Sequence, residues 1–206
     1  MKGDAESCNE KMVLLIAVLL GLASGILRAR LGQRSYRSIE VKHIWLVFVA
    51  YLPQLFAFYL PFTRTAFPDR FIPAILVGSQ CLLLVFAWVN RKLPGFWMLG
   101  MGLVCNILAI ALNGGMMPLP PENAQKLLPA GSQVVLEVGK RVGFGKDILL
   151  PRELTALWFL GDIFLLPEWV NYPLAFSVGD ILISVGAFWL FWQLGGPHKS
   201  SREALS

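Results

Sequence analysis

Five long stretches of the chain consist almost entirely of apolar residues, with short polar segments between them. The stretches are 12–27, 44–62, 71–89, 96–112 and 174–194, and the one charged side chain within them is Asp180. A helix needs about 20 apolar residues to cross the ~30 Å hydrocarbon core of a bilayer. The pattern therefore predicts an all-α membrane protein, one domain over residues 1–206 with about five transmembrane helices.

The overall composition supports this class of protein. Charged residues make up 15% of the chain, hydrophobic residues make up 56%, and the mean hydropathy is +0.61. A typical globular protein has about 25% charged residues. The net charge of +5 does not indicate nucleic-acid binding, because the basic residues flank the apolar stretches instead of forming a continuous stripe. We expect the lipid bilayer as the main partner and no nucleic acid.

The basic residues between the apolar stretches predict an orientation. Residues 28–43 contain five Lys and Arg, and residues 90–95 contain two. Placing both connections and the C-terminal tail in the cytoplasm puts nine basic residues inside, against four in the short outer segments. Cytoplasmic loops carry the excess of Lys and Arg. The N-terminus is therefore expected outside and the C-terminus in the cytoplasm, with the long connection 113–173 outside.

The outer connection has local signals of its own. Asn113-Gly114-Gly115 is expected to end the fourth helix, and Glu122–Leu128 fits a short helix. Glycines surround Lys140, Arg141 and Lys146, but the Walker spacing fails, so we expect a solvated basic loop. Residues 154–166 are apolar but too short to cross easily, which favours an interfacial or re-entrant helix, with a sixth crossing as the alternative.

Polar residues within the apolar stretches identify a candidate site. The fourth stretch carries small and polar residues on one helical face, namely Gly102, Asn106, Ala109 and Asn113. The fifth stretch carries Ser177, Asp180 and Ser184 on one face. A carboxylate in a membrane span costs about 3 kcal/mol or more, so Asp180 suggests a functional role. A packed acid that merely hydrogen-bonds its neighbours is the structural alternative.

A second acid strengthens this hypothesis. Gly161-Asp162-Ile163 repeats the Gly-Asp-Ile sequence found at Asp180. If residues 154–166 fold back against the bundle, Asn113, Asp162 and Asp180 should converge at its outer mouth, with Ser177 and Asn106 behind them. Two nearby carboxylates repel, so a shared proton, a cation or a basic side chain such as Arg152 should accompany them. The competing interpretation is that Asp162 only caps a helix.

Metal, cofactor and catalytic motifs give little support for an enzyme. The three cysteines form no CxxC, and both histidines lie at or beyond the ends of apolar stretches, so neither a metal nor a cofactor is expected. An intramembrane aspartyl protease would use two acids, but its GxGD and Tyr-Asp motifs are absent. We expect a non-enzymatic protein, either a subunit or scaffold of a complex with another membrane protein, or a small transporter or channel. The transporter would carry an ion, a proton or a small polar solute, using Asp180 and Asp162.

Three short motifs carry a family resemblance. Asn113-Gly-Gly-Met-Met-Pro118, Leu160-Gly-Asp-Ile163 and Ser177-Val-Gly-Asp180 resemble an uncharacterised family of bacterial integral-membrane proteins, a domain of unknown function. The resemblance covers roughly residues 12–195. It implies a multi-pass protein of the bacterial inner membrane and brings no activity, ligand or cofactor with it.

Overall fold

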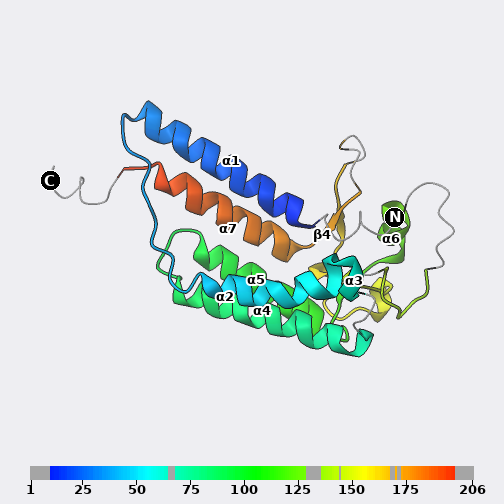
Figure 1. Cartoon of the computed structure of the whole chain (residues 1–206). Helices are drawn as coiled ribbons and strands as arrows, with labels where there is room; N and C mark the ends of the chain where they lie inside the picture. Colours follow the sequence, from blue (N-terminus) through cyan, green and yellow to red (C-terminus); the bar gives the residue numbers. More distant parts are fainter. Residues whose placement is uncertain are drawn as a thin grey trace.

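The computed structural model is mostly helical and describes residues 10–64, 68–128, 136–143, 145–167, 170 and 173–197. Its main helices are α1 (Glu10–Leu31), α2 (Trp45–Gln54), α4 (Ile72–Val89), α5 (Phe96–Leu112) and α7 (Val178–Leu194). They pack in the order α1, α7, α5, α4, α2, so α7 lies between the first and fourth apolar stretches (Figure 1). Consecutive helices reverse direction, and α1 therefore begins at the opposite end of the bundle from the one where α7 ends.

Close helix packing follows from small residues. A Cβ on Gly21 would lie 2.8 Å from the Phe188 carbonyl oxygen, and one on Gly25 would lie 2.4 Å from that of Phe191. Gly21 and Gly25 therefore let α1 approach the α7 backbone closely.

The second apolar stretch is not one continuous α-helix. Pro53 lies inside α2, a π-helical turn follows at Leu55–Tyr59, and α3 (Pro61–Arg64) comes next. Proline removes a backbone donor and clashes with the preceding turn, which explains why the helix changes its winding here. The predicted end of the fourth helix is confirmed, since α5 stops at Leu112 and Gly114 and Gly115 have φ values of 76° and 81°.

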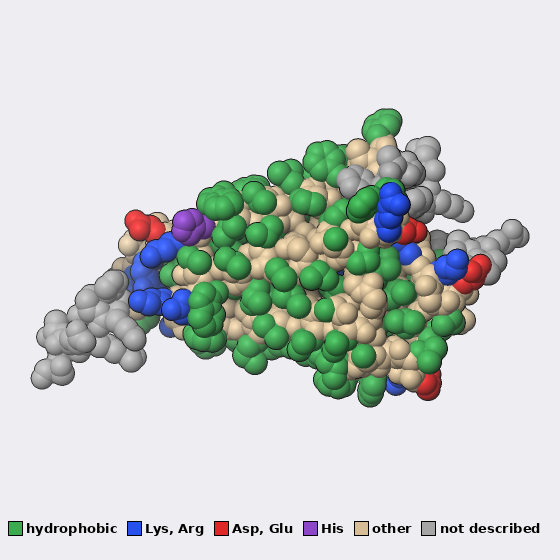
Figure 2. Space-filling view, turned by 90° about the horizontal axis from the view of Figure 1, so that it is seen from below, with side chains coloured by type: hydrophobic (Ala, Val, Ile, Leu, Met, Phe, Trp, Pro, Cys, Tyr) green, Lys and Arg blue, Asp and Glu red, His purple; other side chains and the backbone are tan. Residues whose placement is uncertain are grey.

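Within the described residues, two helical stretches are long and apolar enough to cross a membrane, Val13–Leu31 and Asp69–Val89. Three shorter apolar helices cover Trp45–Tyr59, Phe96–Leu112 and Val178–Leu194. The prediction of five crossings therefore stays a prediction. On the face shown in Figure 2, hydrophobic side chains cover the middle, and charged side chains gather at the two ends.

One end of the bundle, here called the strand end, carries two small sheets and a short helix. Strand β1 (Met117–Leu119) pairs in parallel with β2 (Asp147–Leu149), and β3 (Phe164–Leu165) pairs antiparallel with β4 (Ala175–Phe176). The short helix predicted over Glu122–Leu128 is confirmed, because helix α6 covers Pro121–Leu127. The 3₁₀ turn η2 (Asp69–Phe71) precedes α4 at this end.

The prediction of an interfacial or re-entrant helix over residues 154–166 was wrong. The segment forms the 3₁₀ turns η3 (Arg152–Leu154) and η4 (Trp158–Leu160), followed by β3. Leu157 has a φ of 51°, a left-handed conformation that interrupts a helix, and β3 takes its hydrogen bonds from β4. The last apolar stretch is also shorter as a helix than predicted, because Ala175–Phe176 belongs to β4.

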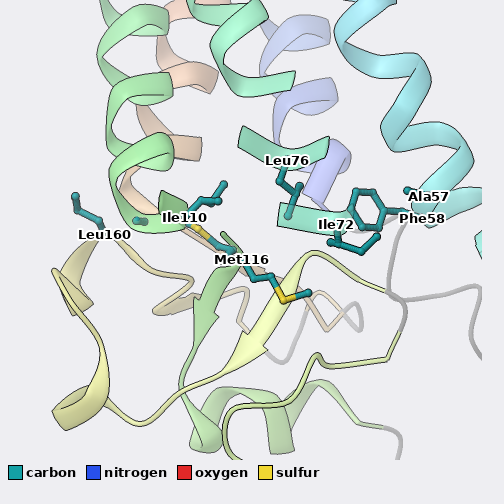
Figure 3. Close-up of a cluster of buried hydrophobic side chains, with 9 residues drawn as sticks. Ala57, Phe58, Ile72, Leu76, Ile110, Met116 and Leu160 are labelled. Atoms are coloured by element: carbon teal, nitrogen blue, oxygen red, sulfur yellow. The ribbon is translucent and has the colours of Figure 1, made fainter. Parts of the chain in front are cut away.

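A buried apolar cluster joins the helices to the strand end (Figure 3). Its members are Ala57, Phe58, Ile72, Leu76, Ala109, Ile110, Met116, Met117 and Leu160. These side chains come from the π-helical turn, α4, α5, β1 and η4, so the cluster fixes the strands over the ends of the helices. The polar residues described below are held in place by this packing.

The opposite end, here called the basic end, consists of the connections 28–43 and 90–95. Its described side chains include seven basic residues, Arg28, Arg30, Arg34, Arg37, Lys42, Arg91 and Lys92, and one acidic residue, Glu40. Arg37 donates to the carbonyls of Gln193 and Leu194, and the Tyr36 hydroxyl donates to that of Phe191 over 2.9 Å. Burial raises the pKa of Tyr36 above its ordinary value. These contacts satisfy the last carbonyls of α7, where cations are favourable.

Candidate functional site

Asp180 lies in the first turn of α7, at the strand end. The Ser177 hydroxyl oxygen accepts a hydrogen bond from the Asp180 amide over 3.1 Å, and the Asp180 carboxylate accepts one from the Ser177 amide over 2.9 Å. This reciprocal pattern is a capping box, and a carboxylate at this position also suits the positive end of the helix dipole. Asp180 was predicted to lie within the last membrane span, whereas in the structure it caps the start of α7.

Asn106 of α5 links this cap to the neighbouring helix. Its side-chain NH₂ donates to Oδ1 of Asp180 over 3.1 Å, and its carbonyl oxygen accepts from the Ser177 hydroxyl over 3.0 Å. Ser177 is fully buried, Asn106 is 5% exposed, and Asp180 is partly buried. Three of the five residues singled out from the sequence, Asn106, Ser177 and Asp180, therefore form one hydrogen-bonded group.

Two glycines make this group possible. A Cβ on Gly179 would lie 1.8 Å from the Asn106 side-chain oxygen, and one on Gly102 would lie 2.5 Å from the Gly179 carbonyl oxygen. The α5 and α7 backbones approach closely where both residues lack side chains, and the Asn106 amide occupies the space over Gly179. The Gly-Asp pair on α7 is thus explained by packing as well as by charge.

Asp162 is part of a separate, buried ion pair. The Nζ of Lys146 lies 2.6 Å from Oδ2 of Asp162 and 3.2 Å from Oδ1 of Asp147. The Asp162 side chain is 1% exposed and that of Lys146 is 17% exposed. The sequence suggested Arg152 as the basic partner, but the structure pairs Asp162 with Lys146. Arg152 is exposed, and its Nε lies 3.9 Å from a carboxylate oxygen of Glu122.

The glycine-rich segment near Lys146 was wrongly predicted to be a solvated basic loop. The Arg141 side chain is 7% exposed and pairs with Asp69 over 2.9 Å, while Lys146 is mostly buried against Asp162. Among these basic residues, Lys140 is the exposed one. The reason is tertiary, since residues 145–149 run alongside β1 and are pulled into the strand end.

Asn113 does not meet either acid in a described contact. Its side-chain NH₂ donates to the carbonyls of Ala109 and Ala156, and its oxygen accepts from the Ala156 amide over 2.9 Å. Asn123 of α6 was not among the residues predicted from the sequence, and its side-chain NH₂ donates to the carbonyls of Asp162 and Ile163. Both asparagines hold the backbone of the segment after β2, and only their burial in the folded chain reveals this role.

A polar cavity lies between the cap and the ion pair. It offers about 110 Å³ to water, and a single water needs roughly 10–15 Å³ on this measure, so several waters fit. Its polar lining comes from four helices and the β2 region, namely Gln54, Gln80, Asn106, Asp180, Lys146 and Asp147. The side-chain oxygen of Gln80 is buried and has no hydrogen-bond partner among the described residues. Buried amide oxygens normally have a partner, so this atom indicates a solvent or ligand position.

The charged residues of the lining favour particular ligands. Lys146 supplies one positive charge, and Asp147 and Asp180 supply two negative charges. The lining therefore has one negative charge in excess and suits a small cation or a solute that donates hydrogen bonds. Within the described part of the chain, no group of three His, Cys, Asp or Glu side chains could hold a metal ion.

Comparison with known proteins places the chain in a family. No solved structure matches it. An uncharacterized protein of Thermotoga maritima is 29% identical over 181 residues, which cover 87% of this chain and 88% of that protein. A family model matches residues 38–192, which leaves α1 outside the match and is narrower than the range expected from the motifs. The chain belongs to this family, the family of unknown function DUF5317.

Proposed function

We propose that this protein crosses the bacterial inner membrane five times and carries a small cation or small polar solute, which it binds in the cavity at the strand end. The observation that supports this role best is the cavity itself, which brings polar side chains of α2, α4, α5 and α7 together in a bundle that is otherwise apolar. Intramembrane polar and ionisable groups commonly mark solute pathways.

The charge distribution supports the proposed orientation. The basic end has seven basic side chains and one acidic side chain. The described side chains of the strand end include six basic residues, Arg70, Lys126, Lys140, Arg141, Lys146 and Arg152, and seven acidic ones, Asp69, Glu122, Glu137, Asp147, Glu153, Asp162 and Asp180. The positive-inside rule then directs the basic end to the cytoplasm and the strand end to the outside.

Asp180 is the residue we expect to bind the solute. Its carboxylate accepts hydrogen bonds from the Asn106 side chain and the Ser177 backbone amide, yet it still lines the cavity. An ionised carboxylate has about four acceptor positions, so it can bind a cation while it stays in the cap. Gln54 and Gln80 on the other side of the cavity would provide the remaining oxygen ligands.

The test uses the purified full-length chain with Na⁺, K⁺ and methylammonium as separate probes. Thermal unfolding in detergent would measure binding, and uptake into proteoliposomes would measure transport. Asp180→Asn should abolish the cation-dependent rise in Tm and the uptake, while the cap is retained because an amide oxygen can still accept. Asp69→Asn is the matched control, since it removes an acid at the same end that does not line the cavity. Equal behaviour of both variants and the natural chain would contradict the proposal.

A non-enzymatic subunit or scaffold of a membrane complex is the second candidate. Helix α1 favours it, because α1 makes its main contact with α7 and leaves large apolar residues exposed on its remaining surface, including Leu15, Leu19, Leu20 and Leu27. A partner helix could cover this surface. Co-purification with another membrane protein in fixed stoichiometry, lost on replacing Leu15 and Leu19 with Ala, would favour this candidate over the carrier.

A further inference from the structure

A second cavity lies far from the polar one, on the surface between α4 and α5 next to the basic end. It is an open apolar groove of about 280 Å³, and its walls include Ala87, Trp88, Trp97, Gly100, Met101 and Val104. Arg91 is the charged residue of its lining. The groove itself is therefore apolar, and one basic residue lies at its rim.

Small residues create the groove. An ideal Cβ on Gly100 would have one neighbour within 4 Å, the Ala87 Cβ at 3.9 Å, so no side chain fills this space. Trp88 and Trp97 flank it with their rings in edge contact, 6.2 Å between centroids, and they are 58% and 60% exposed. Tryptophan is enriched at the membrane–water interface, so an exposed pair at this level suits a position just below the headgroups.

Arg91 is arranged as an anion ligand at the end of the groove. Its guanidinium lies 4.5 Å from the Trp88 ring centroid, and one N–H donates to the Trp88 carbonyl over 3.0 Å. A guanidinium has five N–H donors, so it can still bind a phosphate while held in this position. Lys92 is exposed beside it, and the connection 90–95 has no acidic residue.

We infer that this groove binds an anionic phospholipid, with one acyl chain along α4 and α5 and the headgroup phosphate on Arg91 and Lys92. Charge complementarity selects this occupant, because the apolar body fits a hydrocarbon chain and the groove ends among basic residues. Basic pockets between transmembrane helices on the cytoplasmic side bind anionic headgroups. The inference rests on the proposed membrane-spanning orientation but not on solute transport.

Native mass spectrometry of the purified chain can test this site with two probes, phosphatidylglycerol and phosphatidylcholine of identical chains. We expect the protein to retain phosphatidylglycerol more strongly. The double variant Arg91→Ala, Lys92→Ala should lose the preference for phosphatidylglycerol. Each charge removed should lower the ratio of the two lipids retained by about fivefold. Gly100→Leu should fill the groove and reduce binding of both lipids. Gly78→Leu is its control, because it adds the same side chain to α4 at a position with no atom within 4 Å.

Brominated phosphatidylglycerol provides a second readout in proteoliposomes. It should quench tryptophan fluorescence less in a variant with Trp88→Phe and Trp97→Phe than in the natural chain. Equal retention of the two lipids, an unchanged preference in the Arg91 and Lys92 variant, or equal effects of Gly100→Leu and Gly78→Leu would overturn the inference. Vesicle flotation separates the two failures: a chain that does not insert contradicts the proposed architecture, whereas an inserted chain without lipid preference contradicts only this site.

Discussion

Asn106 and Asp180, on antiparallel helices, are joined by a hydrogen bond of 3.1 Å that passes over Gly179. The bond connects the cap of α7 to the middle of α5, and it lies on the wall of the polar cavity. A side-chain bond between helices restricts their sliding and rotation, so it links the shape of the cavity to the packing of α5 against α7.

Gly179→Ala should strongly destabilise the protein. The new Cβ would lie 1.8 Å from the Asn106 oxygen and 2.7 Å from the Gly102 carbonyl oxygen, so either the amide or the helix must move. Overpacking of this kind costs about 1–3 kcal/mol. Thermal unfolding in detergent would measure the loss. Gly78→Ala, with no atom within 4 Å, should be neutral or slightly stabilising because alanine favours the helix.

Lys146→Met should destabilise the strand end by about 3–5 kcal/mol, because it removes the cation that pairs with the buried Asp162 carboxylate. The pair is 2.6 Å apart, and the Asp162 side chain is 1% exposed. Arg152→Met is the comparison, since its pair with Glu122 is exposed and should contribute no more than about 1 kcal/mol. Denaturation curves would measure the loss in free energy of unfolding for both variants. A small effect of Lys146→Met would show that Asp162 is neutral or solvated in the folded chain.

Asn113→Ala should loosen the segment around Ala156 without unfolding the bundle. The asparagine accepts from the Ala156 amide and donates to its carbonyl, and a buried group left without its partner costs about 1–3 kcal/mol. Amide hydrogen exchange should accelerate at Ala156. Asn123→Ala should instead affect residues 162–163, whose carbonyls it holds. If each variant accelerated amide exchange in both segments, the two asparagines would have to stabilise one cooperative unit instead of separate segments.

The proposed orientation predicts opposite labelling of two exposed positions. In a background without Cys8, Cys81 and Cys105, Ser35→Cys should react with a membrane-impermeant maleimide only after the cells are permeabilised. Glu153→Cys should react in intact cells. Both positions are exposed, so lack of reaction cannot result from burial. Labelling of Ser35→Cys from outside would reverse the orientation.

Local features of the sequence were sufficient to predict the five main helices and several of their ends, but not the structure of residues 154–166. Apolar runs predict helices because all backbone hydrogen bonds of a helix lie within one segment. The glycines after Asn113 and the spacing of Gly21 and Gly25 act through backbone geometry, which is also local. Asn106, Ser177 and Asp180 were identified for the same reason, since helical periodicity puts polar residues of each helix on one face.

The tertiary structure decided which of these residues meet. Helical spacing says nothing about the partner helix, so the bond from Asn106 to Asp180 depended on the α5–α7 packing at Gly102 and Gly179. Asp162 met Lys146 because β2 pairs with β1, a contact between distant segments that composition does not encode. The sequence by itself determined the five main helices and the candidate polar residues. The folded chain alone determined that they form a cap, a buried ion pair and a cavity between them, because each arises from contacts between segments.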